Sequence, residues 1–544
     1  MTGRDALNRI LEQKYPRHYI QRMAPVDFFW LIKKIGEEDA LPILKLASPE
    51  QWQYLLDMEL WQGDRIDLDR ISLWLERFHR ADPSALVAWL THYGQALAYL
   101  YLYKSIQVEA RTWDEDGEVP EGFFSLDGVY FIRIRDKAQE ELIGNILREM
   151  ARNNYEQYQA FISGLMGILP AEVEEGMYRM RNVRLAEEGF LSLEEALSVY
   201  AYLKADALLK APTISERLSS GNEETDALVP VTPLIHTQEN RFLTEAVSRL
   251  RDPLLLDRIR LEFAGLCNQI LSADGLAVND FEDLIRTCRK AEGYLSLGLE
   301  RLTDGNLTLS EQLLKQHPLL SIFRVGFGLA LELKWEAERW IKEAWFHGVG
   351  LGSDFWGEDW GPILSGLLQK HPHFFGGDKF EEDYRDFEKS SDIDDCRQSL
   401  RYMMAIDHIL KGLTAIHPLG ATMVQDPFLT FHPLLFTFWA RQQLKLNAGF
   451  APLSPKQMRR FFEKMRGKTG RPPYRMTPFK DVFLHDMISA IPDRDSVRED
   501  RFREALSTLW TLFDDEYAWV PEEELDEKFT RFLLVVSPGG KVLH

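Results

Sequence analysis

Three arginines lie close together in the sequence and could hold an anion. They are Arg179, Arg181 and Arg184, with Asn182 between them. Guanidinium groups bind phosphate and carboxylate through paired hydrogen bonds, so this spacing is compatible with an anion site. Carboxylates four residues away, such as Glu175, offer ion pairs on the same helical face. The sequence therefore leaves open an anion site and an ion-pair network at a helix junction.

A glycine-rich loop at 350–361 combines aromatic rings with carboxylates. Its candidate ligand-binding residues are Asp354, Trp356, Glu358, Asp359 and Trp360. Aromatic faces can stack on a sugar or hold a cation, and carboxylates supply oxygen ligands to a hard divalent metal. The spacing matches no EF-hand loop, and tryptophans in such a loop also serve to plug it onto a core. Ligand binding and core plugging are both compatible with this pattern.

Two histidines form a third candidate site, because imidazole is a common zinc ligand. His371 and His373 flank a proline, and His408 and His417 follow later in the chain. The HExxH motif is absent from the sequence, and a proline between two histidines equally fits a helix start. A metal site at His371 and His373 is therefore a hypothesis beside a structural role. No cofactor is predicted, apart from a divalent cation that the loop or these histidines could bind.

The most basic stretch of the chain, 456–475, contains Arg466-Gly467-Lys468-Thr469, which is similar to the end of a P-loop. That motif needs glycine where Phe462 stands, so we exclude a P-loop nucleotide triphosphatase. The stretch could bind an anionic partner or be neutralised by the acidic stretch 514–527. The sequence also lacks the Gly-x-Ser-x-Gly, GxGxxG and cysteine-nucleophile signatures. Enzyme classes with short motifs are disfavoured, whereas a site assembled from distant residues is not.

Composition indicates a soluble, acidic protein. Among 544 residues, 64 Lys and Arg stand against 85 Asp and Glu, which gives a formal net charge of −21. This charge repels a nucleic-acid backbone, so nucleic acid is disfavoured as a partner. The three cysteines fit a reducing compartment, and the N-terminus lacks the apolar core of a signal peptide. The apolar stretch 319–333 is too short and too interrupted by charge to span a bilayer, so a cytoplasmic protein without a membrane span is expected.

Short capped helices are expected to position the candidate residues in the first part of the chain. Ser48-Pro49-Glu50-Gln51 has the pattern of a capping box with proline at the first helical position. Asp82-Pro83 repeats the same helix-start signal. The sequence therefore predicts a domain of stacked short helices at 1–104.

The pattern changes after this domain. Alternation at 106–109 and a strand-like run at 129–134, with a turn signal at 114–117, predict a β-hairpin, and helices follow to residue 210. This 105–210 segment is expected to pack on the first domain. The stretch 211–240 has the composition of a linker, and 241–544 reads as a second, all-helical domain. The predicted fold is mainly α, with a superhelical N-terminal region and one hairpin.

Two resemblances add to this prediction. The leucine-rich short helices at 25–102 resemble the superhelical N-terminal domain of MgtE-type magnesium transporters, which implies a cytosolic, cation-responsive regulatory module. The transporter's membrane helices have no counterpart here, and no ligand residue is carried over. The strings Leu56–Asp64 and Tyr178–Phe190 look like a bacterial family of unknown function that matches most of this length.

These observations favour a non-catalytic helical scaffold or regulatory protein that binds another protein through its helical surfaces. The stacked helices, the acidic composition and the missing catalytic motifs support this hypothesis. The alternative is a metal-dependent enzyme or divalent-cation sensor that uses the loop 350–361 or the later histidines.

Overall fold

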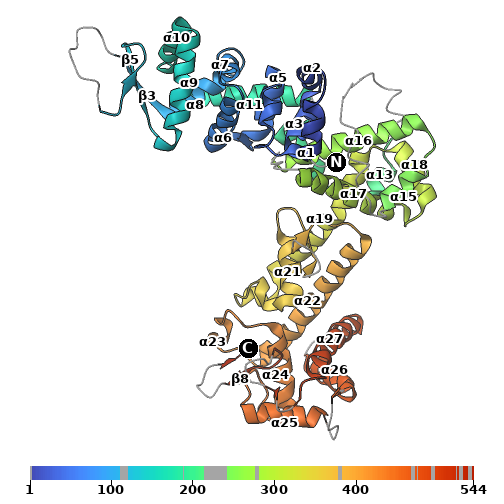
Figure 1. Ribbon diagram of the computed structural model, residues 1–544. Helices are drawn as coiled ribbons and strands as arrows, with labels where there is room; N and C mark the ends of the chain where they lie inside the picture. Colours follow the sequence, from blue (N-terminus) through green and yellow to red (C-terminus); the bar gives the residue numbers. More distant parts are fainter. Residues whose placement is uncertain are drawn as a thin grey trace. The chain divides into compact units, whose positions relative to one another are not determined.

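Helices make up most of the protein, which confirms the predicted mainly α fold (Figure 1). The computed structural model describes residues 3–110, 121–187, 189–212, 242–275, 281–377, 383–466, 472–474, 476–491, 496–521, 524–525, 531–536 and 542–543. The chain divides into two compact units, unit 1 at Met1–Val325 and unit 2 at Gly326–His544. The division falls within the long helix α19 (Leu319–Glu343).

Unit 1 begins with a succession of short helices. The predicted capping box is confirmed: the Ser48 hydroxyl accepts a hydrogen bond from the backbone N–H of Gln51, whose side chain accepts one from Ser48. The carboxylate of Asp82 likewise caps the next predicted start by accepting from the N–H of Ala85. The helices are α1 (Gly3–Leu11), α2 (Pro16–Gln21), α3 (Pro25–Ile35), α4 (Leu41–Leu44), α5 (Pro49–Glu59), α6 (Leu68–Ala81), α7 (Pro83–His92) and α8 (Gln95–Ser105).

The predicted hairpin is present as part of a three-stranded antiparallel sheet. Strand β3 (Ile106–Ala110) pairs with β5 (Tyr130–Ile134), with Ile106 opposite Ile134. The short strand β4 (Phe124–Ser125) pairs with the other edge of β5 and was not predicted. The predicted turn at 114–117 lies outside the described residues. A further short pair, β1 (Trp61–Gln62) and β2 (Arg65–Ile66), follows α5.

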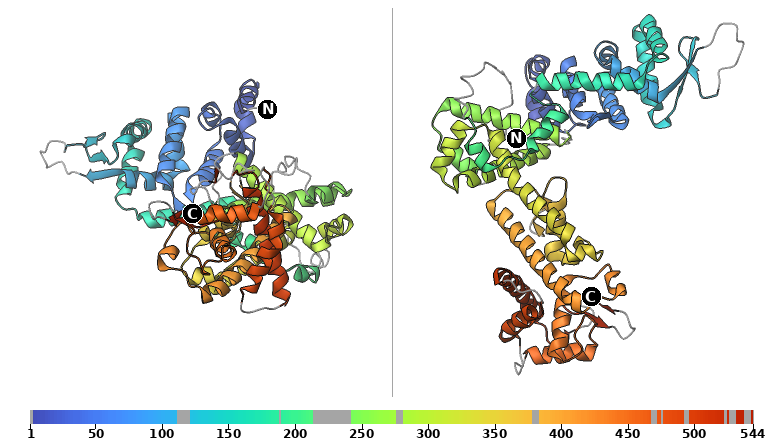
Figure 2. Two further views of the ribbon diagram at one scale, coloured as in Figure 1. Left: turned by 90° about the horizontal axis from the view of Figure 1, so that it is seen from below. Right: turned by 180° about the vertical axis from the view of Figure 1, so that it is seen from behind.

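A long helix, α11 (Pro170–Glu187), runs along the row of short helices and contacts α5 and α8, as the view from behind in Figure 2 shows. Before it come η1 (Lys137–Gln139), α9 (Glu140–Asn153) and α10 (Tyr155–Leu165). After it come α12 (Leu193–Ala196), η2 (Leu197–Tyr200) and α13 (Ala205–Leu209). The remaining helices of unit 1 are α15 (Phe242–Ser248), α16 (Pro253–Ala273), α17 (Phe281–Thr303), α18 (Leu307–Gln316) and the start of α19.

Segments on both sides of the predicted linker 211–240 belong to unit 1. The hydroxyl of Tyr200, before the linker, donates to the Asp274 carboxylate after it over 2.7 Å. Helix α12 and η2 also pack against α16. The division at residue 325 therefore differs in position from the predicted boundary. Most of the linker lies outside the described residues, and its linker character stays a prediction.

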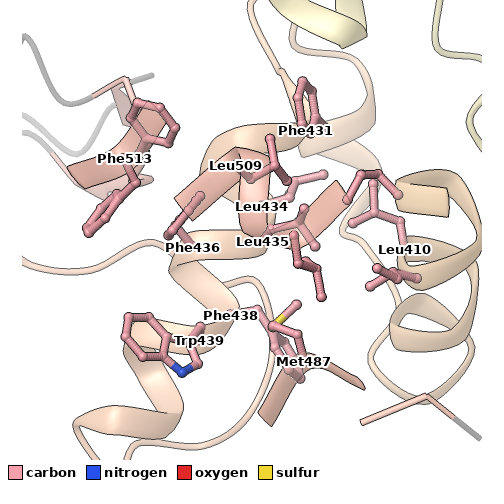
Figure 3. Packing of buried hydrophobic residues seen from close by; sticks show 14 of the residues in the cluster. Leu410, Phe431, Leu434, Leu435, Phe436, Phe438, Trp439, Met487, Leu509 and Phe513 are labelled. Atoms are coloured by element: carbon pink, nitrogen blue, oxygen red, sulfur yellow. The ribbon is translucent and has the colours of Figure 1, made fainter. Parts of the chain in front are cut away.

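Unit 2 is built around an aromatic core (Figure 3). The Phe436 ring stacks on Phe483 and Phe513, with ring centroids 4.9 and 4.5 Å apart. The short strand pairs were not predicted for this region, because strands of two residues leave no periodic signal. Its elements are α20 (Trp345–Gly348), η4 (Ser353–Trp356), α21 (Gly357–Leu368), β6 (Phe374–Phe375), β7 (Tyr384–Arg385), α22 (Ser390–Ile416), α23 (Ala421–Val424), α24 (Phe431–Gln443), α25 (Pro455–Arg466), η6 (Thr477–Phe479), α26 (Lys480–Ser489), α27 (Ser496–Tyr517), β8 (Val535–Val536) and β9 (Val542–Leu543).

All three cysteines are buried, unpaired thiols. The Sγ atoms of Cys267 on α16 and Cys288 on α17 lie 3.9 Å apart. Burial raises the pKa of Cys267, and it raises the pKa of Cys396 to about 12. In the part of the chain that the structure describes, no helix has both the length and the apolar character needed to cross a membrane.

Candidate functional site

An open groove of about 570 Å³ lies in unit 1 between α5, the α7–α8 junction and α11. Most of its wall is apolar. The side chains of Tyr93 and Met180 are 57% and 55% exposed, although both are large and apolar. The groove is lined by Gln53, Leu56, Asp57, Leu60, Trp61, Trp89, Tyr93, Gly94, Gln95, Ala96, Leu97, Tyr99, Glu172, Val173, Gly176, Met177, Met180 and Arg184.

One face of α11 forms a wall of the groove. Val173, Met177, Met180 and Arg184 follow one another at intervals of three or four residues, which places them on one side of the helix. Arg181 lies off this stripe and is buried, with 4% of its surface exposed. Helix α11 thus presents an apolar stripe to the groove and anchors itself through other residues.

The opposite wall depends on a glycine at the α7–α8 junction. A Cβ atom on Gly94 would lie 1.9 Å from the ring of Trp89, closer than any real contact. The absence of a side chain at Gly94 therefore lets the indole of Trp89 occupy its place in the wall. The Trp89 Nε1–H donates to the backbone carbonyl of Pro49 over 3.1 Å, which ties this ring to the start of α5.

Asp57 on α5 is the point at which two of the predicted anion-binding arginines meet. Arg184 donates to both of its carboxylate oxygens from Nε and Nη2, over 2.6 and 2.8 Å. Arg181 donates to the Asp57 backbone carbonyl over 2.7 Å, and its guanidinium lies 5.6 Å from the Trp61 ring centroid. Burial lowers the pKa of Arg181 to about 10. The protein itself thus supplies acceptors to both side chains.

The third arginine of the predicted cluster, Arg179, does not join them. It pairs with Glu175 on the exposed side of α11. Helical geometry places Arg179 on another face of α11 than Arg184, and its pairing with Glu175 matches the ion pair that the sequence offered on that face. The two sequence strings that resemble a known family meet here: Trp61 and Tyr178 approach with ring centroids 5.5 Å apart.

A buried ion-pair network that the sequence analysis did not predict holds α5 from its other side. Lys33 on α3 pairs with Glu59 on α5 over 2.6 Å and with Glu37 over 2.5 Å. Arg77 on α6 continues the network to Glu37 over 2.6 Å. Burial raises the pKa of Glu59, against the opposing effect of the Lys33 charge. Asp57 and Glu59 thus fix α5 between α11 and the helices α3 and α6.

The predicted glycine-rich loop at 350–361 is mostly helical, because η4 and the first turn of α21 lie within it, and its two tryptophans pack inward. Trp356 is fully buried and Trp360 is 6% exposed, and the Trp360 ring stacks on Phe431 at 5.0 Å. Of the two roles that the sequence left open, this burial favours packing onto the core, because protein atoms cover both rings. Asp359 is engaged as well, since it pairs with Arg531 and lies 3.7 Å from Nε2 of the buried His432.

The remaining candidates do not gather into a metal site in the described part of the chain. There, no three His, Cys, Asp or Glu side chains come together closely enough to hold a metal ion, and this includes Asp354, Glu358, His371 and His373. The His371 ring instead packs edge-on against Phe327, with centroids 5.9 Å apart. The P-loop-like residues 467–469 lie outside the described residues.

Fold and groove together define a mainly helical protein with an open, largely apolar cleft in its first unit. A family model described as a family of unknown function, DUF6178, matches residues 1–536, and the chain belongs to this family. No curated protein and no solved structure matches the chain. The resemblance of the first helices to MgtE-type transporters therefore stays a prediction.

Proposed function

We propose that the protein is a non-catalytic binding protein that holds an apolar segment of a partner protein in the groove of unit 1. The observation that carries this proposal is the exposure of Tyr93 and Met180 at the edge of an apolar groove. Large apolar side chains exposed around a concavity are typical of interaction sites. Methionines suit such a surface because their flexible side chains adapt to a partner.

The length of the groove favours a polypeptide over a small metabolite. Its lining residues on α11 run from Glu172 to Arg184, and a rise of 1.5 Å per residue makes this stretch about 18 Å long. That length matches about three turns of a helix. An amphipathic helix that buries its apolar face in a groove is a common mode of peptide recognition.

Charge distinguishes the two ends of the groove. Arg184 is neutralised by Asp57 at one end. Glu172 at the other end has no ion-pair partner within the described ranges. A matching partner segment would therefore carry apolar residues along its middle and a lysine or arginine beside Glu172.

We also place this interaction in the cytoplasm. Cys267 and Cys288 stay thiols although their sulfurs are only 3.9 Å apart. Adjacent free thiols are typical of a reducing compartment.

Photo-crosslinking in cells tests the proposal. A photoreactive phenylalanine analogue placed at position 93 should give a discrete adduct with one partner. The same analogue at position 19 should not, because Tyr19 is also exposed, at 50%, but lies on α2 away from the groove lining.

A pair of charge substitutions sharpens this test. Met180→Glu should lower the adduct yield about tenfold, since a carboxylate in the apolar stripe must be desolvated on binding. Met166→Glu is the matched control, because Met166 is 52% exposed and does not line the groove. Equal adduct yields from positions 93 and 19, or equal effects of the two methionine substitutions, would argue against the groove as the binding surface.

A further inference from the structure

A second cavity, of about 540 Å³, lies in unit 2 between α22 and α27 and has the opposite character to the groove. Arginines line it: Arg397 and Arg401 come from α22, and Arg501 comes from α27. Because residues four apart share a helical face, Arg397 and Arg401 point to the same side of α22. Contacts between the helices bring Arg501 to that side.

Only part of this positive charge is neutralised by the protein. Arg397 pairs over 3.0 Å with Asp394, which also lines the cavity. Glu504, which also lines the cavity, accepts a hydrogen bond from the hydroxyl of Tyr402 over 3.2 Å. Arg401 and Arg501 have no ion-pair partner among the residues that the structure describes. Two guanidinium groups from different helices thus share one cavity in a protein of net charge −21.

We propose that this cavity is an anion site that binds a small phosphate-bearing molecule through Arg401 and Arg501. Two guanidinium groups repel each other, and a multiply charged anion between them removes that repulsion. Each group offers a planar fork of N–H donors that matches phosphate oxygens. A compact ligand fits better than a nucleic acid, because the overall negative charge repels a long polyanion. This inference is independent of the groove in unit 1.

Calorimetric titration of the full chain with pyrophosphate, and separately with inorganic phosphate, tests the proposal. We expect saturable binding that weakens as salt is added. Replacing both Arg401→Gln and Arg501→Gln should weaken binding about tenfold or more, since each removes charge-assisted hydrogen bonds. Both side chains are exposed, so the thermal unfolding of these variants should stay close to that of the parent.

Two further variants distinguish a specific anion site from a general effect of the protein's net charge on anion binding. Arg503→Gln makes the same charge change on α27, but Arg503 pairs with Glu499 and does not line the cavity, so binding should not change. Glu504→Gln should strengthen binding about threefold, because it removes a carboxylate from the cavity. The proposal is overturned if neither anion shows saturable binding. It is equally overturned if Arg503→Gln weakens binding as much as the double substitution, or if Glu504→Gln weakens it.

Discussion

The cavities of the two units differ in how the charged side chains around them are paired. In unit 1 the buried carboxylates of Asp57 and Glu59 on α5 are paired, with Arg184 and Lys33 respectively, and most of the groove wall is apolar. In unit 2 the cavity between α22 and α27 leaves Arg401 and Arg501 exposed to a ligand. A buried ion pair adds little net stability, but it costs much to break. Paired charges therefore determine which helices meet, whereas unpaired charges remain available for binding.

The largest expected effect concerns His432 in the core of unit 2. Burial lowers the pKa of this side chain to about 3, and the charge of Arg531 acts in the same direction. The unfolded chain takes up a proton near pH 6.5, whereas the folded state resists it until about pH 3. Stability from this group is therefore complete above pH 6.5 and falls as the pH drops, by about 4 to 5 kcal/mol in total.

Urea unfolding followed between pH 7 and pH 4 measures most of this loss. His432→Gln should flatten the dependence on pH, whereas His347→Gln should leave it unchanged because His347 is exposed. Hydrogen exchange resolved along the chain should assign the loss to unit 2. A loss of equal size in unit 1 would show that the two units do not unfold separately.

The next largest effect concerns the ion-pair network of unit 1. Lys33→Met leaves the buried carboxylate of Glu59 without its paired cation, which should cost about 3 to 5 kcal/mol in the free energy of unfolding. The cost should shrink as the pH falls, because Glu59 can then take up a proton. Arg80→Gln removes an exposed pair with Glu38 and should cost less than about 1 kcal/mol. Urea unfolding measures both costs. If the two substitutions lowered the free energy of unfolding equally, burial would not be what makes the Lys33 ion pairs costly to break.

The smallest effects concern the groove's glycines. Gly94→Ala should destabilise unit 1 by about 1 to 3 kcal/mol, because the new Cβ displaces the Trp89 ring. Gly176→Ala should instead stabilise it by about 0.5 to 1 kcal/mol, since a Cβ there meets nothing within 4 Å and alanine favours the helix. Thermal unfolding of the two variants shows whether each substitution lowers or raises the stability of unit 1. A Gly94→Ala variant that is more stable than the parent would show that the groove wall is not tightly packed around Trp89.

Local signals allowed much of the fold to be predicted. The capping box at Ser48 and the cap at Asp82 need only neighbouring residues, and both are confirmed. The pairing of 106–110 with 130–134 also follows from alternation and nearness in sequence. These features are encoded within a few turns of chain, so a single sequence reveals them.

The candidate sites depended on contacts that no local pattern contains. Asp57 and Arg184 are 127 positions apart, and Tyr402 and Glu504 are 102 positions apart. No periodicity joins such residues, so neither cavity could be predicted. The loop at 350–361 shows a different limit: Trp356 and Trp360 would suit a ligand platform as well as a core plug, and only their burial distinguishes the two roles.

The buried cysteines give the protein a practical property. A thiol reacts with alkylating reagents as its thiolate, and burial both raises the thiol pKa of Cys396 to about 12 and hides the sulfur. Cys267 and Cys288 are buried as well. A single cysteine introduced at position 93 should therefore take up a maleimide dye selectively in the otherwise unaltered chain. This variant can thus carry one fluorescent reporter at the edge of the groove while all three natural cysteines are kept.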